Sequence, residues 1–383
     1  MSSNKFSVKH ITKTKGFSSF TAALLAIALG LLFGFLVMLA ALPGNSLAGF
    51  GRVLFGGFQS FQKIGDVLYF ATPILMTGLS VGFAFKMGLF NIGASGQYTM
   101  GMFFALYVGF MWPMPSSIHW LVCILAGLIG GMIWGFIPGI LKALFNVNEV
   151  ITSIMFNYIG MYLVDMLIQG NSIMYIPTKT RTAYLPASAQ IPSLGIPYSN
   201  ANISIIIAIL IAILLHITLN KTTFGYELKA TGFNKFASKY AGMSDKRNTI
   251  LTMVIAGSLS GLGGAFAILA PSTIAGSSMT YEPISVIASA GFNGIAVALL
   301  GFANPLGVIF SALFISHIGR GGTLASLLGY KPEIIDVVIA VIIYFSAFAL
   351  IMNAAFGRFI RLKKEKRQNA KQPMDNTTKG KEA

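Results

Sequence analysis

Charged residues, and acids above all, are scarce in this sequence. Asp, Glu, Lys and Arg together make up 10% of the 383 residues, whereas an ordinary soluble domain carries about 25%. So few charges cannot cover a water-facing surface, and the 55% content of hydrophobic residues predicts an integral membrane protein. The composition excludes a disordered chain and a soluble nucleic-acid-binding protein, although the formal net charge is +16.

Cysteine pairs, metal-ligating clusters and catalytic motifs are also missing. Cys123 is the only cysteine, so the chain can form neither an internal disulfide nor a cysteine-based metal site. The four histidines are scattered, and neither an H-E-x-x-H zinc motif nor a G-x-x-x-x-G-K-[ST] phosphate-binding motif occurs. We therefore expect a non-catalytic protein without a cofactor or a metal ion.

Long apolar runs dominate what is present. A helix needs about 20 apolar residues to cross the hydrocarbon core of a membrane. The runs are continuous rather than alternating, which favours helices over a β-barrel. The predicted fold is an all-α polytopic membrane protein, with spans at residues 20–42, 67–85, 98–112, 118–141, 150–168, 203–219, 250–270, 284–300, 305–318 and 334–352.

The positive charge is concentrated outside these ten predicted spans. Nineteen of the 27 Lys and Arg residues lie in residues 1–19, 220–248 and 357–383. Because Lys and Arg accumulate in cytoplasmic loops, both termini and the 220–248 loop are predicted to be cytoplasmic. The predicted domains are a cytoplasmic segment 1–19, a transmembrane domain 20–356 and a basic, disordered tail 357–383.

Two glycine-rich stretches interrupt the apolar runs. The first reads Gly-Leu-Phe-Asn-Ile-Gly-Ala-Ser-Gly-Gln at residues 88–97, and the second reads Gly-Phe-Asn-Gly at residues 291–294, in the middle of the eighth span. Irregular backbone at membrane depth is tolerated where it is buried in protein or lines a watery cavity. Matching interruptions in spans 2–5 and 7–10 predict an internal repeat with a transport site at its interface.

The side chains of these stretches are neutral amides, hydroxyls and aromatic rings. Amides both donate and accept hydrogen bonds, and rings can stack on a sugar or a nucleobase, so an uncharged solute is predicted. In the alternative interpretation, the same groups only hydrogen-bond one helix to another. The candidate pathway residues from these stretches are Phe90, Asn91, Ser95, Gln97, Phe292 and Asn293.

The basic loop at residues 220–248 contains a short amphipathic pattern. Apolar or small residues at Phe233, Phe236, Ala237 and Tyr240 share one helical face, and Gly242 follows as a C-terminal cap. On its own, such a helix could simply lie on the membrane surface.

The loop as a whole resembles the coupling-helix loop of bacterial ATP-binding cassette (ABC) importer permeases, in the branch that carries ribose, nucleosides and branched-chain amino acids. The resemblance rests on Leu-Lys-Ala-x-Gly-x-Asn at residues 228–234 and Tyr-Ala-Gly at residues 240–242. Residues 88–97, 148–158 and 294–301 are similar to stretches of the nucleoside and simple-sugar members. Ser95 departs from the pattern, because many nucleoside members have Glu there.

The resemblance implies a permease subunit of the bacterial cytoplasmic membrane. A second, homologous permease would complete the pathway, a separate cytoplasmic subunit would hydrolyse ATP, and an extracytoplasmic binding protein or lipoprotein would deliver the solute. Nucleosides are the favoured solute, and another neutral sugar or a branched-chain amino acid is the alternative. The family pattern adds Asn157 to the pathway.

The family pattern also implies how the ATPase would bind. A single helix over residues 230–242 would dock on the ATPase, with Gly232 allowing the close approach. The implied coupling residues are Glu227, Ala230, Gly232, Asn234, Ala237, Tyr240 and Gly242.

Two other functions compete with this interpretation. A secondary carrier driven by protons or sodium would be expected to show several acids within its spans, since carboxylates buried in a membrane are costly and usually functional. Asp165, in the fifth span, is the one acid that is a candidate for a buried role, and an interfacial position is the alternative for it. A non-transporting scaffold would have no need of two glycine-broken segments.

Overall fold

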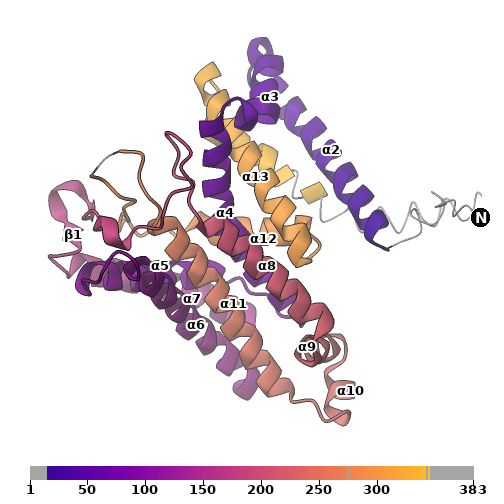
Figure 1. Cartoon of the computed structure of the whole chain (residues 1–383). Coiled ribbons are helices and arrows are strands. Elements are labelled where there is room, and N and C mark those ends of the chain that lie inside the picture. Colours follow the sequence, from indigo (N-terminus) through magenta and orange to yellow (C-terminus); the bar gives the residue numbers. More distant parts are fainter. Residues whose placement is uncertain (1–14, 275, 342–343, 346–383) are drawn as a thin grey trace, which may run out of the picture.

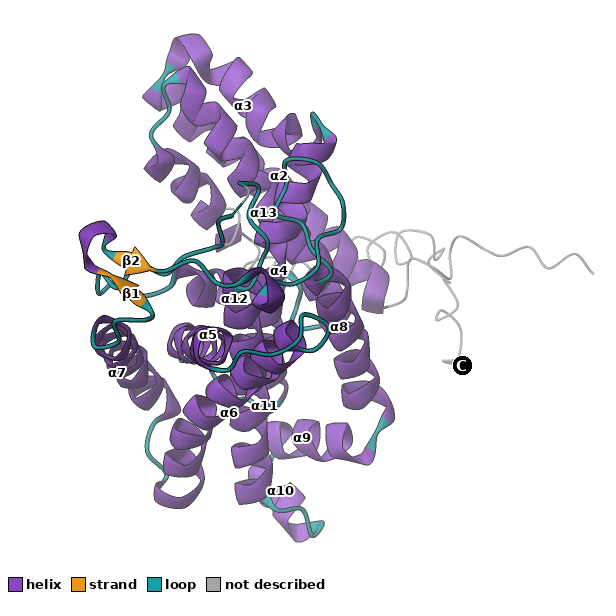
Figure 2. Ribbon diagram, turned by 60° about the vertical axis from the view of Figure 1, so that its left-hand side comes forward, coloured by secondary structure: helices purple, strands orange, loops and turns teal. Residues whose placement is uncertain are grey.

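The structure is a computed structural model that describes residues 15–274, 276–341 and 344–345. The predicted tail 357–383 and residues 1–14 of the predicted segment 1–19 lie outside these residues. Helices make up most of the described chain (Figure 1, Figure 2). The prediction of an all-α membrane protein is confirmed.

The labelled α-helices are α2 (Lys15–Ala41), α3 (Ser46–Phe55), α4 (Phe61–Lys86), α5 (Ala94–Met111), α6 (His119–Phe145), α7 (Glu149–Gln169), α8 (Ser204–Lys221), α9 (Thr223–Phe233), α10 (Lys235–Tyr240), α11 (Asp245–Ile268), α12 (Ser289–Leu300) and α13 (Pro305–Ala325). Residues 332–341 and 344–345 are also helical. Short 3-10 turns lie at Pro43–Asn45, Gly56–Phe58, Pro177–Lys179, Ala187–Ala189 and Ser326–Leu328. One antiparallel hairpin pairs β1 (Tyr175–Ile176) with β2 (Arg181–Thr182).

Side-chain caps explain where several of these helices begin. The Asn148 side chain accepts a hydrogen bond from the backbone N–H of Val150 and so starts α7. Asn304 does the same for Leu306 at the start of α13. Such caps satisfy backbone donors that the first turn of a helix leaves without a partner.

Each of the ten predicted spans falls on helix where the structure describes it, with part of the tenth outside the described residues. Six of the described helices, α4, α6, α7, α8, α11 and α13, are long and apolar enough to cross a membrane. The total of ten spans therefore stays a prediction. The eighth predicted span is shorter than expected, because helix α12 begins only at Ser289.

Helix α11 lies at the centre of the bundle and packs on α4, α5 and α6. In the same way, α4 packs on α12 and α13 (Figure 2). The first helix of each half thus contacts the second and third helices of the other half. This reciprocal packing is the arrangement expected of the predicted repeat of spans 2–5 and 7–10.

Glycines bring the central helices into backbone contact, as their spacing predicts. A methyl group added to Gly131 of α6 would collide with the carbonyl oxygen of Gly257 in α11. One added to Gly101 of α5 would collide with the backbone of Gly261, also in α11. Any side chain at these positions would therefore force three helices apart.

The two ends of α11 carry different structures (Figure 1). Helices α9 and α10 precede its first residue. Residues 170–203 and 269–288, which we call the loop cap, lie together beyond its last turn. Within the loop cap, the backbone N–H of Ile191 donates to the carbonyl of Leu269 at 2.8 Å, and that of Thr182 to Tyr281 at 2.9 Å.

We expect Gly131→Ala to destabilise the protein by about 1–3 kcal/mol, the usual cost of overpacking a filled interior. Gly319→Ala is the matched control, because a methyl group there meets no atom within 4 Å. The measurement is the temperature at which the detergent-purified protein loses its monodisperse size-exclusion peak. Equal temperatures for the two variants would contradict the packing argument.

Candidate transport pathway and coupling surface

The first glycine-rich stretch forms a break between α4 and α5, as predicted. Helix α4 ends at Lys86, and Gly88 then adopts a φ of +75°, a left-handed conformation that favours glycine. The chain turns through residues 87–93 and enters α5 at Ala94. This turn carries Asn91 into the interior of the bundle, where its side chain is fully buried.

Asn91 and Gln97 bind each other by two hydrogen bonds. The Asn91 Nδ2 donates to Gln97 Oε1 at 2.8 Å, and Gln97 Nε2 donates to Asn91 Oδ1 at 3.1 Å. Asn91 Nδ2 also donates to Ser80 Oγ of α4, at 3.0 Å. These bonds connect the turn at residues 87–93 to the start of α5 and to α4.

Asn157 ties the same break to α7. Its Nδ2 donates to the carbonyl of Ile92 at 3.0 Å, and its Oδ1 accepts from the backbone N–H of Gly96 at 2.8 Å. The Ile92 carbonyl lies in the break and the Gly96 N–H lies in the first turn of α5, where regular helix hydrogen bonds are not available. Asn91 and Gln97 thus form hydrogen bonds of the kind that the alternative interpretation describes, and Asn157 links α7 to the same break.

Ser95 lies where α5 meets α12. Its hydroxyl is buried and has no hydrogen-bond partner in the described part of the chain. A methyl group on Gly291 of α12 would collide with this hydroxyl, and one on Gly294 would collide with Thr77 of α4. The two glycines therefore allow α12 to pack closely against α4 and α5.

The prediction that residues 291–294 interrupt a helix is wrong. They form the first turns of α12, and the irregular backbone lies just before them. Ser285 has a φ of +57°, which is unusual for a residue other than glycine. The helix begins late because the chain reaches it from the loop cap, and the Thr77 hydroxyl binds the carbonyl of Ala290 at 2.8 Å.

Phe292 and Asn293 point away from this close contact. Both are exposed, and the Asn293 side chain forms no hydrogen bond with the described residues. Phe90 is half-buried and stacks on Phe85, with ring centroids 5.1 Å apart. The candidate pathway residues thus divide into a buried network and a face that is open to a ligand or to another chain.

The predicted coupling helix over residues 230–242 is two helices rather than one. Asn234 is extended, and its side chain accepts from the backbone N–H groups of Phe236 and Ala237, both at 3.0 Å. It therefore caps α10 and separates it from α9. Gly242, at a φ of +81°, follows the end of α10 as predicted.

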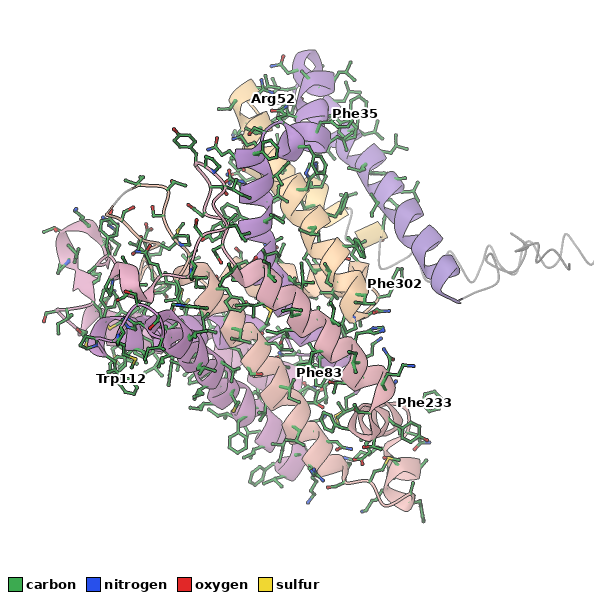
Figure 3. All side chains as sticks on the ribbon, in the orientation of Figure 1. Phe35, Arg52, Phe83, Trp112, Phe233 and Phe302 are labelled. Carbon is green, nitrogen blue, oxygen red and sulfur yellow. The ribbon has the colours of Figure 1, made fainter. Side chains whose placement is uncertain are left out.

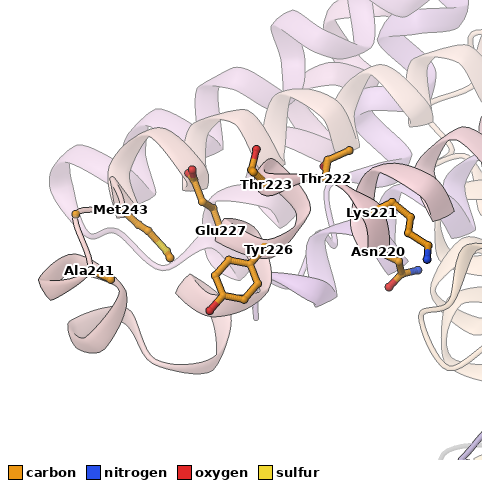
Figure 4. A pocket seen from close by; sticks show the side chains of 9 residues that line it. Asn220, Lys221, Thr222, Thr223, Tyr226, Glu227, Ala241 and Met243 are labelled. Atoms are coloured by element: carbon orange, nitrogen blue, oxygen red, sulfur yellow. The ribbon is translucent and has the colours of Figure 1, made fainter.

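Three aromatic side chains project from α9 and α10 into open space. Phe233 is 95% exposed, Phe236 78% and Tyr240 96%, and Figure 3 shows Phe233 turned away from the bundle. Ala237 is exposed beside them. We call these four residues the aromatic surface. Next to it, Tyr226 and Glu227 line an open depression of about 660 Å³ between α8, α9 and the turn after α10 (Figure 4).

The inner side of α9 contacts the break between α4 and α5. A methyl group on Gly232 would collide with the backbone of Met87, so this glycine allows a close approach within the chain. Thr252 of α11 donates to the sulfur of Met87 at 3.0 Å. Asn248 of α11 donates to Thr231 of α9, also at 3.0 Å. The aromatic surface is thereby joined to the turn that carries Asn91, a contact that sequence spacing alone could not show.

Residues 63–347 match the family described as "Branched-chain amino acid transport system / permease component". The match covers most of the chain and includes both glycine-rich stretches and α9–α10. The chain therefore belongs to this family of membrane permeases.

Comparison with individual relatives agrees with this assignment. The chain is 38% identical to the guanosine ABC transporter permease NupP of Bacillus subtilis, over 90% of this chain and 97% of NupP. It is 37% identical to the nucleoside ABC transporter permease NupB of Lactococcus lactis, over 86% and 91%. NupQ, a guanosine ABC transporter permease of B. subtilis, is 25% identical over 70% and 84%. No solved structure matches the chain significantly.

We expect Asn157→Leu to lower the stability of the protein. The change leaves the N–H of Gly96 and the carbonyl of Ile92 without partners, at about 1–3 kcal/mol for each group. Asn293→Leu is the same chemical change at an exposed position and should leave stability unaltered. Thermal unfolding of both variants in detergent tests this, and an Asn157→Leu protein as stable as the wild type would rule out the bridging role.

Proposed function

We propose that this chain is a permease subunit of an ATP-driven importer that carries nucleosides. The observation that carries the proposal is the identity of 37–38% with nucleoside and guanosine ABC permeases along almost the whole chain. Loss of a binding site or of a coupling loop would be expected to interrupt such a match. The neutral, partly aromatic groups at the breaks are also those that suit an uncharged ribose and base.

The translocation pathway in this proposal lies between this chain and a second permease. Phe292 and Asn293 lie on an exposed face of α12, where the partner chain would complete a site. Two differently named guanosine permeases of one organism, NupP and NupQ, both resemble this chain. That pairing supports a heterodimer of related permeases.

The buried pathway candidates take an indirect part. Asn91, Gln97 and Asn157 hold the break between α4 and α5 in place, and Ser95 packs against Gly291 of α12. Phe90 and Phe292 offer ring faces. In this arrangement the amide network keeps the first break in place, while α12 presents Asn293 to the solute. Only the exposed groups would contact the solute in the state that the structure describes.

The α9–α10 end is assigned to the cytoplasm because the basic residues concentrate there. Residues 20–356 would then form the transmembrane domain, with segment 1–19 and the basic tail 357–383 on the cytoplasmic side. The loop cap would face outward, toward the solute-binding protein or lipoprotein.

The aromatic surface is the proposed docking site for the separate ATP-binding subunit. Aromatic residues are strong anchors at protein interfaces, and the three here are between 78% and 96% exposed. Glu227 and Ala230 lie on the preceding helix, α9, and Asn234 and Gly242 shape the two ends of α10. Movement of this surface would reach the turn before Asn91 directly, through Gly232 and Met87.

Transport in sealed proteoliposomes tests the proposed function. The vesicles contain this chain with the proteins that co-purify with it, and labelled guanosine is offered with competing nucleosides, glucose or leucine. We expect uptake only with ATP supplied to the ATPase side, with competition by nucleosides alone, and with Asn293→Leu lowering uptake at least fivefold. Uptake that needs no ATP and collapses with an ionophore would show a secondary carrier instead.

A second test concerns docking of the ATPase. We expect the double variant Phe236→Ala/Tyr240→Ala to reduce co-purification of the ATP-binding subunit to below a tenth, because each buried aromatic anchor contributes about 2 kcal/mol or more. Tyr198→Ala is the control, since Tyr198 is an exposed tyrosine in the loop cap. Normal co-purification of the double variant would place the docking site elsewhere.

A further inference from the structure

Asp165 is a buried carboxylate that neither the family match nor the proposed function uses. It lies in the last turns of α7, and only 4% of its surface is exposed. No basic side chain lies within ion-pair distance of it in the described part of the chain. An unpaired carboxylate is costly to bury, so its hydrogen bonds must compensate.

Three donors from one segment of the loop cap surround this carboxylate. The Tyr281 hydroxyl donates to Oδ1 at 2.6 Å. The backbone N–H of Ser285 donates to Oδ2 at 2.8 Å, and the Ser285 hydroxyl donates to the same oxygen at 3.2 Å. Both oxygens are therefore occupied, each by a different residue.

The chemistry of the donors fits a permanent contact. Burial, and secondly the hydrogen bond to Asp165, raise the pKa of Tyr281 well above its ordinary range, so the phenol keeps its proton. Three hydrogen bonds thus meet at one side chain. They can hold Ser285 in its left-handed conformation, which is otherwise unfavourable.

Neighbouring hydrogen bonds extend the same contact. Tyr281 and Thr182 of β2 exchange two bonds, from the Thr182 N–H to the Tyr281 carbonyl at 2.9 Å and from the Tyr281 N–H to the Thr182 hydroxyl at 3.0 Å. One turn after Asp165, Gln169 donates to the carbonyl of Pro283 at 3.1 Å. The end of α7, the hairpin and residues 281–285 thus form one unit.

This unit stands directly before α12. Only residues 286–288 separate Ser285 from the first residue of that helix, so α12 cannot shift far along its axis while Ser285 stays bound. A shift of α12 would move Phe292 and Asn293, the two exposed residues near its start.

We propose that Asp165 is a positioning residue that clamps residues 281–285 and thereby sets where α12 enters the bundle. It touches no solute. It fixes the place of Phe292 and Asn293 through the chain that leads to them, and the pathway opens on the loop-cap side only as this clamp yields. The effect on transport rests on the proposed function, whereas the clamp itself does not.

Asp165→Asn is the critical variant, because an amide has one accepting oxygen and one donating nitrogen. If the amide nitrogen faces Ser285, it meets the Ser285 N–H, which cannot accept a hydrogen bond. If it faces Tyr281, the hydroxyl must turn to accept from it, and the hydroxyl proton loses the acceptor that it has in the unaltered protein. Either orientation leaves one donor of the loop cap without its partner. We expect hydrogen–deuterium exchange of the backbone in residues 278–288 to become at least tenfold faster. Tyr281→Phe, which removes one of the three bonds, should give a smaller increase, and Tyr184→Phe in the same loop cap should give none.

Uptake by the same variants tests the positioning role. We expect Asp165→Asn to reduce maximal uptake per folded transporter at least fivefold, while the solute concentration for half-maximal uptake changes less than twofold. Unchanged exchange in both Asp165→Asn and Tyr281→Phe would overturn the clamp, and faster exchange with normal uptake would overturn its role in positioning α12. Absence of nucleoside uptake in the unaltered protein would count against the proposed function alone, since the exchange measurement requires no transport.

Discussion

Backbone contact between α11 and its neighbours is the constraint on which the rest of the structure depends. Inside a membrane, helices gain little from the hydrophobic effect and associate by close packing instead. Gly131 of α6 and Gly101 of α5 meet Gly257 and Gly261 of α11 with no room for a side chain. This contact sets the spacing of the bundle, and with it the positions of the break between α4 and α5, of α12 and of α9.

A second constraint follows from the first. Helices packed this closely leave no water for backbone groups at a break, so each N–H and carbonyl there needs a partner from the protein. Asn157 supplies two such partners, and the amides of Asn91 and Gln97 satisfy each other. The amides that looked like solute ligands in the sequence are therefore the groups that make an interrupted helix possible.

The two ends of the bundle are connected to its centre by different contacts. At the α9–α10 end, Gly232 packs against the backbone of Met87 and so connects the aromatic surface to the break between α4 and α5. At the loop cap, Asp165 holds the segment that leads into α12. A movement at the α9–α10 end therefore reaches the break between α4 and α5, and a movement of the loop cap reaches the start of α12.

The sequence by itself determined the class of protein, the apolar segments and the break at residues 88–97, because composition and hydropathy are local properties. It also determined the Gly242 cap, since a glycine after an amphipathic pattern has one common use. Only the tertiary structure decided that Asn234 divides the coupling segment, that Gly291 packs against Ser95 without breaking a helix, and that Asp165 binds residues far along the chain. Those outcomes depend on which distant backbone lies within reach, and no spacing within a single segment carries that information.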